Sequence, residues 1–193
     1  MTLEHLVSTA RWTTEPVAVE FGDETLRVTA AENSDAWRTT SYGFVHDTEH
    51  ALISPLPADS AIEVSFLLDF SEPFDQAGLF ARNSDSEWMK AGVEVSDGAP
   101  QLGAVVTHGF SDWSVAPVAE WAGRTVTMRA SRTGDAITVR ARVDDEDFRL
   151  VRLAYFSPEV NLEAGLYCCG ATRAGLVVTF TGYRQTEADE SLH

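Results

Sequence analysis

Alternation along one stretch of the chain places unusual chemical groups on a single predicted face. From Trp88 onward the residues WMKAGVEV alternate between polar or large and apolar types. A strand would therefore place Trp88, Lys90, Gly92 and Glu94 on one side and an apolar set on the other. An indole, an ammonium group and a carboxylate on one face suit a polar, ring-shaped ligand, because sugar rings stack on indole faces. We expect this face to bind such a ligand.

Acid–base chemistry at Glu94 is the first alternative to simple binding. Glycoside hydrolysis needs two carboxyl groups across the scissile bond, about 5 Å apart for retention and further apart for inversion. Glu94 shares its predicted face with Lys90 and has no second acid two or four positions away. The acidic run 144–147 is interpreted as a solvated turn. A pair made across strands, for example Glu94 with Asp112, remains open, so a glycoside-active enzyme with Glu94 as catalytic carboxylate is the alternative to a non-catalytic platform.

Metal-ligand residue types occur around His46 and His50, with Asp47 and Glu49 between them. Zinc sites need three or four such ligands, and no third ligand stands at a reliable spacing here. We expect a surface loop that holds two histidines, and no metal or cofactor.

Aromatic residues alternate in the same segment, residues 37–50, where Tyr42, Phe44 and His46 would share one face of a strand. Such a face is interpreted either as the lining of a groove or as part of the core. Further along, the motif 111–114 follows a predicted strand and is predicted to form a loop at a sheet edge. From that loop Trp113 either folds over the concave face or closes one end of the fold.

The elements that must position these residues are predicted to be short strands. Turn-forming residues recur about every ten positions, and no helical period is sustained, a pattern typical of an all-β sandwich or barrel. The predicted strands are Thr25–Ala30, Ala61–Asp69, Ala77–Arg82, Trp88–Ser96, Gln101–Thr107, Thr125–Ser131, Ala136–Val143, Arg149–Ala154, Glu163–Cys169 and Leu176–Tyr183. Loops 96–100 and 132–135 are short enough to form hairpins. Residues 1–10 are predicted as a short helical turn or an unstructured lead-in.

Composition limits the classes of function. The chain has 193 residues and a formal net charge of −16, from 30 acidic and 14 basic residues. A strongly acidic surface repels phosphate backbones and anionic membranes, so we expect no nucleic-acid and no membrane partner. No secretory signal pattern or membrane-spanning stretch is recognised. We therefore expect a cytoplasmic protein.

Cysteine usage agrees with a reducing compartment. The two cysteines, Cys168 and Cys169, are neighbours. Adjacent cysteines rarely form a disulfide, because successive strand side chains point apart. Reduced thiols are predicted, with a vicinal redox pair or a soft-metal site as the alternative.

Five motifs taken in order resemble a known family. They are residues 37–44 (WRTTSYGF), 75–79 (DQAGL), 88–94 (WMKAGVE), 97–98 (DG) and 111–114 (SDWS). Together they resemble the "regulation of enolase" proteins of unassigned function, a family similar to the concanavalin A-like lectin/glucanase superfamily. The resemblance spans about residues 11–183. It implies a concanavalin A-like antiparallel β-sandwich (jelly roll) of two large curved sheets, whose concave face binds or cuts polysaccharides in relatives. It implies no activity, because fold does not determine function.

These observations combine into one prediction. Residues 1–193 are predicted to form a single β-sandwich domain with its core at about 11–183 and a frayed acidic tail at 185–193. The concave sheet is predicted to bind a saccharide or polyol without catalysis. The predicted ligand-binding residues are Gln76, Trp88, Lys90, Glu94, Trp113, Tyr42 and Gln101. A regulatory or structural protein-binding domain, including a homodimer, is the third possibility.

Overall fold

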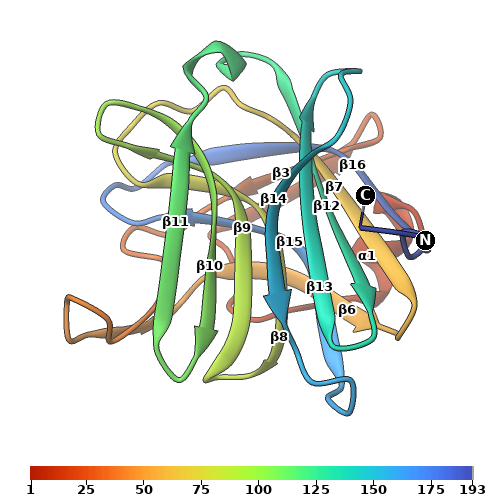
Figure 1. Cartoon of the computed structure of the whole chain (residues 1–193). Coiled ribbons are helices and arrows are strands. Elements are labelled where there is room, and N and C mark those ends of the chain that lie inside the picture. The colour runs from red at the N-terminus through yellow and green to blue at the C-terminus, as the bar shows by residue number, and fades with distance from the viewer. Residues whose placement is uncertain (193) are drawn as a thin grey trace.

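The computed structural model describes residues 1–192, and most of them lie in two antiparallel sheets of seven strands each. The first sheet has the order β1 (Arg11–Trp12), β6 (His50–Leu56), β15 (Leu162–Gly170), β8 (Asp75–Ser84), β9 (Glu87–Ser96), β10 (Ala99–His108) and β11 (Ser111–Pro117). The second has the order β14 (Arg149–Tyr155), β13 (Ala136–Val143), β12 (Thr125–Thr133), β7 (Ser60–Leu67), β16 (Val177–Glu187), β3 (Thr25–Thr29) and β2 (Ala18–Gly22). A separate two-stranded hairpin consists of β4 (Ala36–Arg38) and β5 (Val45–Asp47). Figure 1 shows the strongly twisted sheets, with β9, β10 and β11 side by side in the first.

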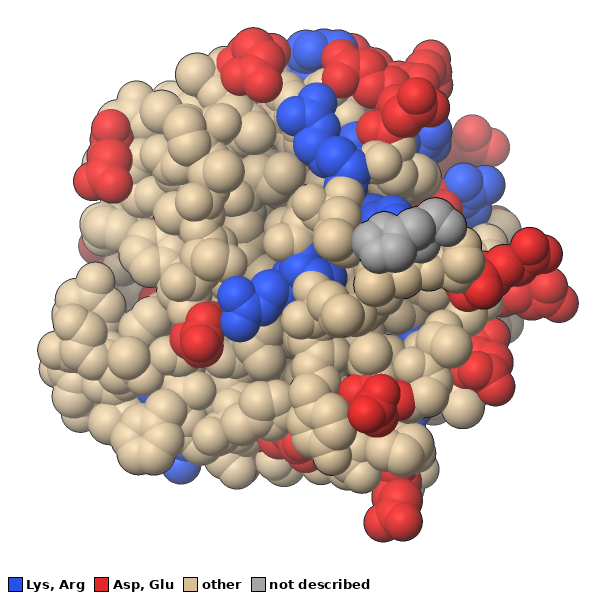
Figure 2. Space-filling view, in the orientation of Figure 1, with Lys and Arg blue, Asp and Glu red and all other residues tan. Residues whose placement is uncertain are grey.

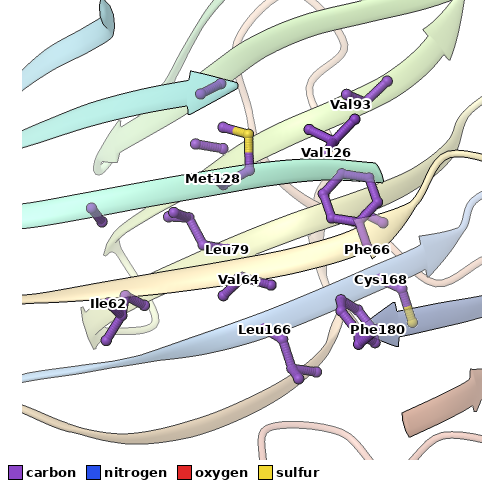
Figure 3. Close-up of a cluster of buried hydrophobic side chains, with 14 of the residues drawn as sticks. Ile62, Val64, Phe66, Leu79, Val93, Val126, Met128, Leu166, Cys168 and Phe180 are labelled. Atoms are coloured by element: carbon purple, nitrogen blue, oxygen red, sulfur yellow. The ribbon is translucent and has the colours of Figure 1, made fainter. Parts of the chain in front are cut away.

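The hydrophobic core lies between the two sheets. Alternate residues of facing strands point inward, as in Leu79 and Val93 of the first sheet and Val64, Phe66 and Met128 of the second (Figure 3). Each of these side chains is fully buried. Burial of one such side chain contributes about 1.5–3 kcal/mol, so this layer dominates the stability of the fold. The predicted antiparallel β-sandwich is confirmed.

All ten predicted strands are present, with bounds that differ by a few residues, and both predicted hairpins form. The sequence prediction missed β6, because the Ser54-Pro55 pair inside it is typical of a turn. Proline is tolerated at Pro55 because β1 pairs only with Leu52 and Ile53, which leaves no strand beside Pro55 on that side. The motif 111–114 is also not a loop. It begins the edge strand β11, whose residues are mostly exposed and therefore give a weak alternation signal.

Both ends of the chain lie at the same side of the sandwich (Figure 1). Residues 1–10 contain a helix, α1 (Leu3–Thr9), which is capped by the Thr2 side chain and buries Leu3 and Leu6. The predicted fraying of the tail from Gln185 is wrong as far as Asp189. Strand β16 continues to Glu187, and the Asp189 carboxylate pairs with Arg129 and Arg140 on the outer face of the second sheet. His193, the last residue of the predicted tail, lies outside the described residues.

The described part of the chain contains two helices, α1 and a short 3-10 helix, η1 (Ala119–Trp121). Within residues 1–192 no helix is long and apolar enough to cross a membrane.

Candidate ligand pocket

The outer face of the first sheet brings together the polar residues that alternation had placed on one side. Strand register sets Glu94 of β9 between Gln76 of β8 and Gln101 of β10. Four residues further back on β9, Lys90 lies opposite Val105, which in turn lies opposite Trp113 of β11. These residues therefore share one face across four strands.

Glycines form a row across the middle of this face. Gly78, Gly92 and Gly103 lie in register on β8, β9 and β10, and Tyr167 of β15 continues the row. A Cβ atom at Gly78, Gly92 or Gly103 would lie 2.1 Å from a main-chain oxygen of the neighbouring strand. No side chain fits there, so the row leaves a shallow depression walled by Tyr167, beside the polar residues.

The β4–β5 hairpin covers part of the same face with aromatic rings. Its loop does not continue as a strand, because Thr39, Ser41 and Gly43 all have positive φ values (66°, 66° and 76°). The predicted alternation over residues 37–50 is therefore wrong. The tight loop brings Trp37 to the same side as Tyr42, with 5.6 Å between ring centroids.

Ring contacts extend this aromatic wall in both directions. Tyr42 stacks on Phe44 (5.3 Å between centroids), and Phe44 meets the His46 ring edge-on. Trp37 also meets Trp113 of β11 edge-on at 6.4 Å. Tyr42 keeps 62% of its surface exposed and Trp113 keeps 39%, so both rings remain available to a ligand. Of the two readings of Tyr42, the groove lining agrees with the structure.

A hydrogen-bonded group of three side chains forms the floor beneath these rings. The Lys90 ammonium donates to Asp35 Oδ1 at 2.7 Å and to Gln76 Oε1 at 2.8 Å. The Gln76 amide nitrogen donates to the same Asp35 oxygen at 3.2 Å. Lys90 is only 4% exposed, so its ammonium group is largely shielded from solvent. Burial lowers the pKa of Lys90, but the nearby carboxylates of Asp35 and Glu94 outweigh it, so the pKa is raised and the ammonium stays charged.

Glu94 lies beside this group without joining it. Among residues 1–192 its carboxylate has no hydrogen-bond or ion-pair partner, although it lines the pocket. Burial raises the pKa of Glu94; the Lys90 ammonium opposes that rise and the Asp35 carboxylate adds to it. A half-buried, unpaired carboxyl group is costly to the fold, and carboxyl groups whose pKa is raised by burial are found at many functional sites.

These groups enclose a pocket of about 350 Å³. Its lining residues are Asn33, Asp35, Trp37, Tyr42, Phe44, His46, Phe74, Gln76, Lys90, Glu94, Val105, Trp113 and Ala171. Five of the seven residues predicted from the sequence line it: Gln76, Lys90, Glu94, Trp113 and Tyr42. Gln101 lies beside it, in the glycine-floored depression. A volume of this size is typical of small-molecule sites.

Trp88 corrects the sequence prediction. Its indole is 4% exposed and stacks on Phe80 with 5.6 Å between centroids, so it does not line the pocket. It belongs to a second, smaller hydrophobic cluster on the outer face of the first sheet, which also contains Trp37 and Tyr167. Alternation placed Trp88 on the correct face of the strand. Other side chains of this cluster pack over the indole, so Trp88 is buried and is not exposed to a ligand.

Two other expectations change. Asp112 cannot pair with Glu94, because it points to the opposite side of β11 from Trp113 and forms an ion pair with Arg152. Asp35, which the sequence analysis missed, is the carboxylate that shares the pocket with Glu94.

His50 is not in a surface loop. It is buried in β6, where its two ring nitrogens meet the Ala31 N–H (2.9 Å) and the Thr14 carbonyl (3.0 Å). Burial lowers the pKa of His50. In the described part of the chain, no three histidine, cysteine, aspartate or glutamate side chains group as a metal site would require.

Cys168 and Cys169 are both free and fully buried, on opposite faces of β15. Burial raises the pKa of both thiols.

In the view of Figure 2, acidic and basic groups gather mostly away from β10 and β11, although one acidic and one basic group lie over these strands. Two antiparallel sheets packed face to face, with an aromatic pocket on the outer face of one of them, make this chain a β-sandwich protein. The chain belongs to the DUF1349 family of proteins of unknown function, which it matches over residues 12–188. The resemblance inferred from the sequence motifs is thereby confirmed.

Similar proteins extend this picture. The chain is 34% identical over 182 residues to Regulation of enolase protein 1 of Saccharomyces cerevisiae, covering 93% of this chain and 90% of that protein. A crystal structure of a functionally unknown protein from Saccharomyces cerevisiae superposes with a TM-score of 0.88 at 31% identity, covering 94% of this chain and 97% of that one. The xylan β-1,4-xylosidase of Bacillus halodurans shares the fold with a TM-score of 0.63 at 14% identity, over 84% of this chain and 33% of the enzyme. The last likeness concerns the fold alone, and the chain spans about a third of that enzyme.

Proposed function

We propose that the protein binds a saccharide or polyol in the pocket of the first sheet, without catalysis. The carrying observation is the combination of an exposed aromatic wall with a hydrogen-bonding floor in one pocket of about 350 Å³. Tyr42 and Trp113 offer ring faces on which the apolar face of a sugar stacks, while the Glu94 carboxylate offers oxygens that accept hydrogen bonds from hydroxyls. The floor is held in place before a ligand arrives, because Lys90 fixes both Asp35 and Gln76.

Titration of neutral mono- and oligosaccharides and of polyols tests this proposal. Trp37 and Trp113 line the pocket, so intrinsic tryptophan fluorescence reports its occupation, and calorimetry then gives the affinity. Loss of one stacking ring costs about 1 kcal/mol, so Trp113→Ala should weaken binding roughly 5-fold to 10-fold. Phe110→Ala is the matched control, since Phe110 is 65% exposed but lies outside the pocket lining.

Two results would contradict the proposal. One is the absence of any fluorescence or calorimetric response across the panel. The other is a response that Trp113→Ala and Phe110→Ala reduce equally, because a ligand outside the pocket would not distinguish the two rings.

A glycoside-active enzyme is the second candidate function, favoured by one observation. Burial raises the pKa of Glu94, as a general acid requires, and Asp35 supplies a second carboxylate in the same pocket. Against it, Asp35 Oδ1 is engaged by Lys90 and Gln76. Hydrolysis of aryl glycosides by the wild type, lost in Glu94→Gln, would support the enzyme. Turnover no faster than in buffer would exclude it for those substrates.

A further inference from the structure

The charged side chains that line the pocket differ in how many of their hydrogen-bonding atoms already have a partner within the protein. Among its described lining residues, Lys90 is the single lysine or arginine, and its ammonium is already bonded to Asp35 and Gln76. The pocket therefore has no unengaged cationic side chain of that kind to offer an anionic ligand.

Acceptors, in contrast, are left over. Three donors converge on Oδ1 of Asp35: the Lys90 ammonium, the Gln76 amide and the backbone N–H of Ala36 at 2.8 Å. Oδ2 of Asp35 accepts no hydrogen bond from residues 1–192, and the same is true of the whole Glu94 carboxylate. Two acidic side chains thus bring unused oxygens to the lining of one pocket.

The aromatic wall points to the same kind of ligand independently. Ring faces attract cations because the π-system is negative above its plane. Tyr42 and Trp113 keep large exposed fractions, and Phe44 and Phe74 are each 43% exposed. Carboxylate oxygens beside such rings favour a positively charged group over a neutral one.

We propose that the pocket selects a saccharide or polyol that carries a protonated amino group, held by the Glu94 carboxylate and the free oxygen of Asp35. This inference rests on the proposed function and narrows its ligand class. The ammonium supplies the counter-charge that Glu94 lacks, and the carbon skeleton of the ligand lies against the Tyr42 and Trp113 rings. Uronates and sugar phosphates are disfavoured, because they would bring a second negative charge to Glu94 in a chain of net charge −16.

Matched pairs of small ligands test the inference by calorimetry at neutral pH. Glucosamine is compared with N-acetylglucosamine and glucose, and glucamine (the primary amine of a sorbitol skeleton) is compared with sorbitol. A hydrogen bond between charged groups contributes about 1.5–3 kcal/mol, so each amine should bind roughly 10-fold to 100-fold more tightly than its neutral partner. Glu94→Gln keeps the size of the side chain and should remove most of that preference, so that each amine and its neutral partner bind with similar affinity.

Glu20→Gln is the control for general electrostatic attraction. It also removes one negative charge, but from an exposed position on β2 outside the pocket lining. An amine preference that survives Glu20→Gln and disappears in Glu94→Gln supports the inference.

Distinct outcomes overturn the two proposals. Equal affinities for amine and neutral ligands, or an amine preference that Glu94→Gln leaves intact, overturn the amine inference while ligand binding in the pocket stands. Failure of every sugar and polyol to bind overturns both.

Discussion

Replacement of Lys90 by methionine removes the ammonium group on which the pocket floor depends, while keeping a long side chain. The wild-type ammonium donates to Asp35 Oδ1 at 2.7 Å and to Gln76 Oε1 at 2.8 Å. Removal of one partner from a buried ion pair costs about 3–5 kcal/mol, because the other charge is left uncompensated. Asp35 keeps 21% of its side chain exposed and retains two other donors, so we expect a smaller loss than this range, about 2–3 kcal/mol.

Chemical and thermal unfolding measure this loss. In a chain of this size each kcal/mol lowers Tm by about 2–4 °C, so Lys90→Met should melt roughly 4–12 °C below the wild type. Arg27→Met is the control, because Arg27 and Glu20 form an exposed ion pair worth less than about 1 kcal/mol.

A double-mutant cycle with Asp35→Asn isolates the interaction itself. Once Asp35 carries no charge, loss of the Lys90 ammonium should cost less, and the two changes should couple by about 1 kcal/mol or more. A loss in Lys90→Met as small as that in Arg27→Met, or strictly additive effects of Lys90→Met and Asp35→Asn, would refute the reasoning.

Three further outcomes follow from burial and packing. Burial raises the pKa of Glu94 above its ordinary value of 4.5, so the folded state binds the proton more tightly than the unfolded state, and ionisation of Glu94 destabilises the fold. Glu94→Gln should therefore raise Tm at neutral pH. In a series of melts, the difference in Tm between Glu94→Gln and the wild type should vanish as the pH falls below 4.5. Gly92→Ala should destabilise the fold by at least about 2 kcal/mol in denaturant titration, because the new Cβ would lie 2.1 Å from a main-chain oxygen. Gly22→Ala is the control: Gly22 has open space around it, so this variant should stay within about 1 kcal/mol of the wild type. The buried thiols of Cys168 and Cys169, whose pKa values burial raises, should resist a thiol reagent in the native protein and both react after unfolding; rapid native labelling would contradict their placement.

Most strands of the sandwich can be predicted from local alternation, because a strand with one buried and one solvent-exposed face alternates between apolar and polar residues. The strand 136–143, for example, begins and ends where the alternation does. Strand β11 escaped prediction because an edge strand exposed on both faces needs no apolar period. Strand β6 was not predicted because a proline inside a strand is normally unfavourable. Pro55 is tolerated because the neighbouring strand β1 ends before it, and local sequence does not reveal how strands are arranged in the sheet.

The candidate site was predictable only as far as one face of one strand. Alternation brought Lys90 and Glu94 together, and their neighbour on β8, Gln76, also followed from strand position. Asp35 contacts Lys90 across 55 positions of sequence, and no local pattern connects the two. Trp88 shows the complementary failure, because alternation names the face of a side chain but not the hairpin that covers it.

The two carboxylates of the pocket differ in what balances their charge. The protein supplies Asp35 with an ammonium, an amide and a backbone N–H, and this fixes its position. Glu94 receives no such partner within residues 1–192, so its ionised form costs free energy in the folded protein. A residue that destabilises the fold is retained most readily where a ligand supplies the missing partner, as stability is commonly exchanged for function at binding sites. The same carboxylate therefore links both tests: Glu94→Gln should make the protein more stable and poorer at distinguishing an amine from its neutral counterpart.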